Sequence, residues 1–272
     1  MDQVGEVSRA LVDHIPVIWV KPAKQSVSRL ALWLPPLSRA KDDVLPFLQE
    51  LAGVGFVAVS LDPWQHGERA TESGEQIMER VFGNFRRHMW PILGQTTLDS
   101  LRVLDWATTN LGSGPEVVAG GVSMGGDVAV ALAGIDKRVT RVASIVATPD
   151  WTRPGMRDIR DPSRFLPQGQ ADAYAQWFYD HLDPFTHLDA YAHGPAISFE
   201  CGAEDTHVPP DGALRFQAAL RAAYPQVAER VRVAVHPGFG HIDAAMSSSL
   251  SQNCLAWLLE GPASPKPNQT PA

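Results

Sequence analysis

Ser123 lies in a glycine-rich segment that could present a nucleophile. Residues 121–125 read Gly-Val-Ser-Met-Gly, and they stand between an apolar run at 116–120 and a helix-forming run at 124–133. A Gly-x-Ser-x-Gly pattern between a strand and a helix is typical of a sharp turn that exposes the serine hydroxyl. The helix N-terminus that follows, with the free N–H of Met124, favours developing negative charge. The pattern predicts a serine that attacks a carbonyl carbon.

A serine hydroxyl needs a general base, and that base needs a carboxylate to orient it. In this arrangement the acid and then the histidine follow the serine along the chain. Asp205 comes just after a predicted strand at 196–201, and His241 comes just after a predicted strand at 231–236. Ser123, Asp205 and His241 are therefore predicted to form a catalytic triad.

Other acidic residues and histidines near these positions are weaker candidates. Glu204 is the neighbour of Asp205 and is expected to point elsewhere, whereas Asp211 is expected to cap the helix that follows. His236 ends a strand and is expected to fix the next loop. The other histidines considered are expected to be structural or exposed: His14, His88, His181, His187, His193 and His207.

Strands and helices that could position the three side chains alternate along the chain. The predicted strands lie at 15–20, 30–34, 54–60, 116–120, 141–147, 196–201 and 231–236. Several are dense in Val, Ile and Ala without polar alternation, which is typical of strands buried on both faces. The predicted helices lie at 44–53, 75–111 with a break near Pro91, 124–133, 210–223 and 243–259. The alternation predicts an α/β protein whose mostly parallel sheet is covered on both faces, with ligand sites at the carboxyl ends of the strands.

The segment from 152 to 194 interrupts this alternation. It delays the next strand by more residues than a connector needs, and it is rich in aromatic side chains. We expect a helical cap over a pocket, although some of the aromatic residues would only pack the insert onto the body. A single domain is predicted for 1–260, with the cap insert at about 152–194. Three prolines between 262 and 267 predict a disordered tail over 261–272.

The composition suits one substantial core. Of the 272 residues, 44% are apolar and 19% are charged, which argues against a disordered chain. The formal charge is −7 without a basic stripe, so we expect no nucleic-acid partner. No apolar run approaches the roughly 20 residues of a membrane span, and the first residues lack a secretory pattern, so we expect no membrane association. Only Cys201 and Cys254 are present, which excludes a disulfide framework and favours the cytoplasm.

Taken together, these motifs resemble those of the α/β-hydrolase superfamily over about Ile15 to Leu259. Within it the chain is most similar to small bacterial carboxylesterases related to dienelactone hydrolases and to the catalytic domain of prolyl oligopeptidases. Dienelactone hydrolases themselves carry a cysteine nucleophile, where this chain has serine. The motifs that carry the resemblance are Gly-Val-Ser-Met-Gly-Gly at 121–126, Gly-Ala-Glu-Asp-Thr-His-Val-Pro at 202–209, Gly-Phe-Gly-His at 238–241, and the loop at 61–69, in which Asp62 and His66 would be architectural.

The loop at 34–39 departs from the pattern of the family. Such families usually have His-Gly where this chain reads Leu-Pro-Pro-Leu-Ser-Arg. Because proline has no N–H, the resemblance places the oxyanion donors at the backbone N–H groups of Leu37 and Met124. The two prolines could preorganise this loop or displace it. Arg39 is expected to be a solvated surface cation, although Arg39 and Ser38 could instead bind a charged substrate group.

The triad and the resemblance together predict a serine hydrolase that cleaves a carboxylic ester through an acyl-enzyme, without metal or organic cofactor. Its partner would be a small-molecule ester with a small to medium acyl or aryl group, and the oligomeric state is left open. Cap aromatics are expected to line the pocket together with four further side chains, several of which could equally belong to the core. These four are Trp64, Met89, Trp90 and Trp151.

Other functions use the same machinery. A thioesterase, lactonase or amidase differs only in the bond that is cleaved. The altered loop at 34–39 could instead mark a lyase, acyltransferase or cyclase of a biosynthetic pathway. A peptidase is less expected, because the gating domain that accompanies prolyl oligopeptidases is absent. A catalytically inactive receptor is disfavoured, since a receptor has no need of all three triad residues.

Overall fold

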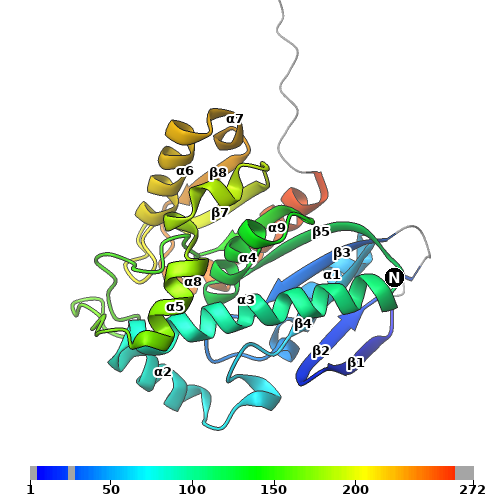
Figure 1. Ribbon diagram of the computed structural model, residues 1–272, viewed down its shortest axis with the longest axis horizontal. Coiled ribbons are helices and arrows are strands. Elements are labelled where there is room, and N and C mark those ends of the chain that lie inside the picture. The colour runs from blue at the N-terminus through cyan, green and yellow to red at the C-terminus, as the bar shows by residue number, and fades with distance from the viewer. Residues whose placement is uncertain (1–4, 24–27, 261–272) are drawn as a thin grey trace, which may run out of the picture.

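Eight strands form one sheet in the order β1-β2-β4-β3-β5-β6-β7-β8 (Figure 1). The computed structural model describes residues 5–23 and 28–260. The first two strands pair antiparallel with their neighbours, and every pair from β4 onward is parallel. This confirms the predicted α/β-hydrolase architecture. The strands are β1 (Val7–Val12), β2 (Ile15–Val20), β3 (Ser28–Leu34), β4 (Phe56–Leu61), β5 (Ser113–Val122), β6 (Val139–Ile145), β7 (Ala196–Gly202) and β8 (Val231–His236).

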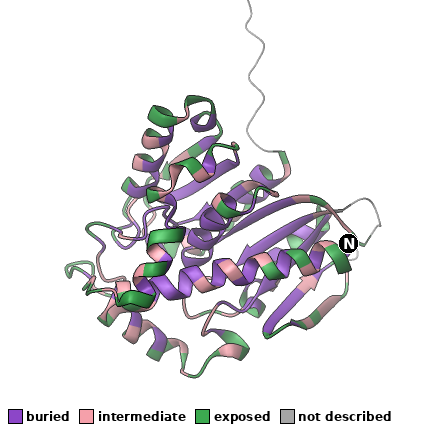
Figure 2. Cartoon of the chain, in the orientation of Figure 1, coloured by how far each residue is buried: buried purple, intermediate pink, exposed green. Residues whose placement is uncertain are grey.

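Helices cover both faces of the sheet, so that the central strands are almost wholly buried (Figure 2). One core cluster joins the sheet to α3, α4 and α6, and a second joins its other face to α1 and α9. None of the helices in the described ranges combines the length and the apolar character that a bilayer crossing requires. The helices are α1 (Leu45–Gly53), α2 (Gly74–Gly83), α3 (Phe85–Asn110), α4 (Met124–Ile135), α5 (Ala173–Leu182), α6 (Asp211–Ala223), α7 (Pro225–Ala228), α8 (His241–Ala245) and α9 (Ser248–Glu260).

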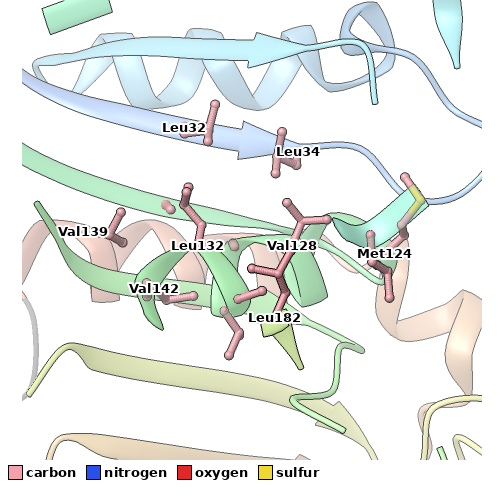
Figure 3. Close-up of a cluster of buried hydrophobic side chains, with 14 of the residues drawn as sticks. Leu32, Leu34, Met124, Val128, Leu132, Val139, Val142 and Leu182 are labelled. Carbon is pink, nitrogen blue, oxygen red and sulfur yellow. The ribbon is translucent and has the colours of Figure 1, made fainter. Parts of the chain in front are cut away.

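Helix α4, which begins directly after Ser123, packs against the sheet. Figure 3 shows Leu32 and Leu34 of β3 in one cluster with Val128 and Leu132 of α4, and all four side chains are buried. Burying one such aliphatic side chain stabilises the fold by about 1.5–3 kcal/mol. The start of α4 is therefore fixed against the carboxyl end of β3.

The predicted helix break near Pro91 is wrong. The break lies at Asn84, whose N–H donates to Arg80 O at the end of α2 and whose side chain accepts a hydrogen bond from Arg87 N at the start of α3. Pro91 lies inside α3, where it lacks the N–H of a normal helical residue. Its neighbours Trp90 and Ile92 are buried, and this packing offsets the lost hydrogen bond.

Strand β1 and the turn that leads to β2 were missing from the predicted elements. Most residues of β1 are partly or fully exposed, so its sequence lacks the dense apolar run of the central strands. Asp13 adopts a left-handed φ of 54° in the turn, a conformation that aspartate tolerates better than most residues. The strand is held by antiparallel pairing with β2, which is a tertiary constraint.

The chain between β6 and β7 contains α5 and the short 3₁₀ turns η3 (Pro184–Thr186) and η4 (Leu188–Tyr191). Asp183 ties this segment to the body, because its carboxylate accepts hydrogen bonds from Trp151 N (2.8 Å) and Thr186 N (2.9 Å). Burial raises the pKa of Asp183 to about 6. The cap over 152–194 stays a prediction, and the predicted tail at 261–272 lies outside the described residues.

We expect Gly94→Ala to destabilise the protein, because α5 crosses α3 closely at this glycine. A Cβ on Gly94 would lie 2.1 Å from a ring carbon of Phe178. The resulting overpacking costs about 1–3 kcal/mol, which exceeds the helix-propensity gain of at most about 1 kcal/mol. Thermal unfolding should show a lower midpoint. Gly53→Ala is the matched control, because a Cβ there meets nothing within 4 Å. Equal midpoints for the two variants would contradict the close crossing.

Candidate active site

Ser123 occupies the sharp turn between β5 and α4. Its backbone has φ 52° and ψ −118°, a conformation that costs a non-glycine residue about 1–3 kcal/mol. The flanking glycines permit the turn. A Cβ on Gly121 would lie 2.6 Å from Leu34 O, and a Cβ on Gly125 would lie 2.2 Å from the same oxygen. The strain and the close approach place the hydroxyl at the carboxyl end of β5.

His241 is the first residue of α8, in the connection that follows β8. Its Nε2 lies 3.1 Å from Ser123 Oγ, and its Nδ1 lies 2.7 Å from Asp205 Oδ2. The serine and histidine are about 8% and 9% exposed, so both are largely buried and retain a little solvent-accessible surface. The structure thus brings together the three side chains that the sequence analysis singled out.

Asp205 is held in the loop after β7 by the backbone around it. Its side chain is fully buried, and its Oδ1 accepts hydrogen bonds from His207 N (2.9 Å) and Val208 N (2.8 Å). The other oxygen is thereby left for His241. Because a carboxylate only accepts hydrogen bonds, the shared proton lies on Nδ1 of the imidazole, and Nε2 faces the serine as an acceptor.

The rival residues make other contacts. Glu204 is exposed and accepts a hydrogen bond from a backbone N–H in the loop after β8. Asp211 lies in the first turn of α6 and pairs with Arg215 (2.6 Å). His236 lies 2.7 Å from the buried carboxylate of Glu200. None of these three takes part in the cluster around the serine.

A second histidine, to which the sequence analysis gave no functional role, borders the site. The ring of His207 lies edge-on to that of His241 at 4.9 Å and to that of Phe82 at 5.4 Å. Its Nδ1 donates to Arg157 O (2.8 Å). Burial lowers the pKa of His207 to about 3, so this imidazole is neutral beside the site. Its place two residues after Asp205 was the only sequence signal.

The loop after β3 lies against the first turn of α4, where a Cβ on Gly125 would also be 2.8 Å from Pro35 O. Ser38 has a left-handed φ of 68°, and Arg39 N donates to Pro36 O (3.1 Å) to close a turn. Within the described residues, Leu37 N donates to no acceptor. The first N–H groups of α4 likewise have no partner inside the helix. The N–H groups at 37 and 124 are thus available, and their use as oxyanion donors stays a prediction.

Arg39 is exposed, as expected, and faces Asp43 at 3.7 Å. The loop after β3, to which Arg39 belongs, is anchored by Asp62, a buried carboxylate directly after β4. Asp62 accepts hydrogen bonds from Lys41 N (3.0 Å), Lys41 Nζ (3.1 Å) and Glu68 N (2.9 Å). These contacts join the loop after β3 to the loop after β4, which is the architectural role expected of Asp62.

His66 is also enclosed by protein. Its Nδ1 donates to Trp64 O (2.8 Å), and burial lowers the pKa of the imidazole. This hydrogen bond joins two residues of the turn after β4 and so stabilises its conformation. His66 therefore has the architectural role that the sequence analysis expected.

Three of the four side chains expected to line the pocket lie in the core. Met89, Trp90 and Trp151 are almost fully buried. Trp90 Nε1 donates to Trp151 O (2.9 Å), and its ring stacks on Tyr179 at 4.4 Å. Trp64 is only partly buried, so the expectation of substrate contact rests mainly on Trp64.

Trp64 lines a cleft of about 190 Å³ between the loop after β4, α2, α3 and the start of α5. The cleft combines aromatic surface with two guanidinium groups. Arg80 donates to Gln65 Oε1 (2.8 Å), and Arg87 faces Asp172 at 3.4 Å. The other residues that line the cleft are His88, Pro91 and Tyr174.

The fold is shared with several solved structures. TT1662 from Thermus thermophilus is 23% identical, with 97% of this chain and 100% of that chain covered and a TM-score of 0.71. A putative dienelactone hydrolase from Klebsiella pneumoniae is 14% identical, with 94% and 98% covered and a TM-score of 0.66. An acylaminoacyl peptidase from Pyrococcus horikoshii is 13% identical, with 98% and 43% covered and a TM-score of 0.68. At these identities the likeness shows the fold.

The sequence itself gives the family. No curated protein matches the chain significantly. The model of the prolyl oligopeptidase family matches residues 83–261, which is more than half of the chain and includes the segments of Ser123, Asp205 and His241. The chain therefore belongs to the prolyl oligopeptidase family, and it is a serine hydrolase with the α/β-hydrolase fold.

Proposed function

We propose that this enzyme is a carboxylesterase that works through an acyl-enzyme on Ser123. The observation that carries the proposal is the chain of two contacts from Ser123 Oγ to His241 Nε2 (3.1 Å) and from His241 Nδ1 to Asp205 Oδ2 (2.7 Å). A serine hydroxyl is activated when an adjacent base can take its proton. The contacts supply that base and the group that orients it.

The reaction proceeds in two half-reactions. His241 Nε2 takes the proton of Ser123 as Oγ forms a bond to the ester carbonyl carbon. The N–H groups of Leu37 and Met124 stabilise the oxyanion of the tetrahedral intermediate. The intermediate collapses, the ester C–O bond breaks, and the alcohol leaves with the proton from His241. Water then attacks the acyl-enzyme with the same base, and the acid and free serine are released.

We place the larger substituent of the ester in the cleft beside Trp64. The cleft lies beside α2, whose Phe82 contacts His207, and His207 in turn contacts His241. Phe82 itself does not line the cleft, so these contacts connect the base to helix α2, whose Arg80 lines the cleft. Aromatic side chains supply broad apolar surface for an acyl or aryl group of moderate size.

The alternatives named above share the triad and differ in the bond cleaved or in the acceptor of the acyl group. An available N–H at Leu37 can stabilise the oxyanion in hydrolysis and in acyl transfer alike, so these alternatives are separated by experiment. Turnover of p-nitrophenyl acetate and butyrate supports the esterase. Covalent labelling of the serine without turnover of either ester supports a lyase, acyltransferase or cyclase.

We also propose that the enzyme acts in a reducing compartment, the cytoplasm. Cys201 and Cys254 are both free thiols and both buried. Burial raises the pKa of each thiol, and that of Cys201 reaches about 12. Neither thiol is therefore a competing nucleophile at neutral pH.

We expect a fluorophosphonate probe to label Ser123, because the reagent phosphonylates an activated serine. Labelling and the turnover of p-nitrophenyl butyrate should both be lost in Ser123→Ala. Peptide mass spectrometry of the labelled protein identifies the residue. Ser249→Ala, on the surface in α9, is the matched control and should label as the wild type does. Labelling of the Ser123→Ala variant would contradict the assignment.

Asp205→Asn should lower kcat for p-nitrophenyl butyrate by about 10³–10⁴-fold, because the amide no longer holds His241 in the tautomer that accepts the serine proton. Stopped-flow or long-time assays measure the residual rate. Glu204→Gln changes the neighbouring, exposed carboxylate in the same way and should stay within about twofold of the wild type. Equal losses in the two variants would show that the carboxylate at 205 has no special role.

Trp64→Ala should raise KM for aryl esters by up to about tenfold while KM for a small alkyl ester such as ethyl acetate changes little, since an aromatic contact is worth about 0.5–1.5 kcal/mol. Trp177→Ala, at an exposed position on α5, is the control. Steady-state kinetics with both ester classes give the comparison. A parallel rise for small and large esters would argue against the cleft as the binding place.

A further inference from the structure

A buried ion pair lies next to the nucleophile turn and is not used by the mechanism above. Asp127, in the first turn of α4, is fully buried, and the side chain of Arg153, in the loop after β6, is 2% exposed. Arg153 Nη2 donates to Asp127 Oδ2. The N–H of Asp127 donates to Ser123 O (3.0 Å), and its Oδ1 accepts a hydrogen bond from Thr148 N (2.7 Å).

The loop that carries Arg153 also supports the acid of the triad. Arg157 N donates to Thr206 O (2.9 Å), and Arg157 O accepts the Nδ1 hydrogen bond of His207 (2.8 Å). Arg153 itself has a left-handed φ of 41°, and its guanidinium lies over the ring of Phe85 at 5.1 Å. One short segment is thus bonded to the nucleophile helix on one side and to the acid loop on the other.

A buried ion pair is a costly way to fill space, because the desolvation of two charges often exceeds their attraction. Apolar side chains of similar volume would join the same segments at lower cost. We therefore expect a function that requires the two charges of the pair next to Ser123. The neighbouring group whose charge changes during the proposed reaction is His241, which takes the proton of the serine and later returns it.

Two titratable groups contact His241 directly, Asp205 and His207. The carboxylate of Asp205 is hydrogen-bonded to it, and the ring of His207 is neutral. A positive charge on His241 lowers the pKa of the Asp127 carboxyl, which burial raises, and Arg153 lowers the pKa of His207. Asp127 is therefore coupled to His241 and Arg153 to the neighbouring His207, and the charges of the pair oppose each other.

We propose that Asp127 and Arg153 are positioning residues for the acyl transfer proposed above. The pair joins the nucleophile turn to the acid loop and keeps the charge near His241 balanced while the imidazole takes and returns the serine proton. The inference rests on the proposed function of Ser123 and His241. It adds a second, buried charge pair to the residues on which the rate depends.

The sign of each effect follows from Coulomb's law. Removal of the Asp127 charge leaves Arg153 positive, and this positive charge disfavours the protonated form of His241. The acid limb, which is the fall of kcat/KM at low pH as His241 is protonated, then moves to lower pH. Removal of the Arg153 charge leaves the carboxylate, which favours the imidazolium and moves the limb to higher pH. Removal of both charges leaves the net charge of the pair at zero, as in the wild type, so the acid limb should return to its wild-type pH. If the pair had only a structural role, the acid limbs of the two single variants would not move in opposite, predictable directions.

The test compares Asp127→Asn, Arg153→Gln, the double variant Asp127→Asn/Arg153→Met and the charge-conserving Arg153→Lys. We expect Asp127→Asn to lower kcat at least tenfold and to move the acid limb about one pH unit down, and Arg153→Gln to move it up. The double variant and Arg153→Lys should have the limb within about 0.3 pH units of the wild type. Thermal melts confirm that each variant is folded.

A second readout does not depend on turnover. The proton shared by His241 and Asp205 gives a downfield resonance in NMR, whose pH titration should shift in the same directions. An unmoved titration in a folded Asp127→Asn variant, or a double variant as displaced as either single variant, would overturn the inference. If Asp127→Asn does not fold, the upward shift of Arg153→Gln and its absence in Arg153→Lys decide the question. A wild type that titrates normally but neither labels nor hydrolyses esters would instead contradict the proposed function.

Discussion

The left-handed backbone of Ser123 is the constraint on which the rest of the site depends. The turn between β5 and α4 places a strained residue where two neighbouring glycines, Gly121 and Gly125, touch the backbone of Leu34. Strain of this kind persists only where the surrounding structure over-determines it. The surrounding structure is the packing of α4 on the sheet, so the aliphatic core behind the turn also supports the geometry of the hydroxyl.

The sequence predicted the fold well where local and tertiary forces agree. The strands at 15–20 and 231–236 have the observed bounds. The apolar residues of 15–20 are buried by helices on either face, whereas the edge strand at 231–236 is only partly buried and pairs with β7 along its whole length. Prediction failed where tertiary contacts dominate. Strand β1 is mostly exposed and depends on pairing with β2, and α3 continues through Pro91 because buried neighbours offset the missing hydrogen bond.

The site was predictable to the extent that it follows strand ends. Ser123, Asp205 and His241 each follow a parallel strand, and such strands end at one edge of the sheet. No comparable pattern identified Arg153, because its burial depends on an ion-pair partner that lies on another element. The tryptophans show the same limit, since residue type alone does not separate a side chain in the core from Trp64 at the cleft.

The buried carboxylate of Asp62 has a consequence for how the enzyme can adapt to a ligand. It binds Lys41 on one side and Glu68 on the other, and so fastens the loop next to Leu37 to the loop that carries Trp64. These hydrogen bonds couple the positions of the two loops. Under the proposed binding mode, a bulky substrate that displaced the cleft wall would also displace the N–H of Leu37, so selection by size and retention of rate would be mechanically linked.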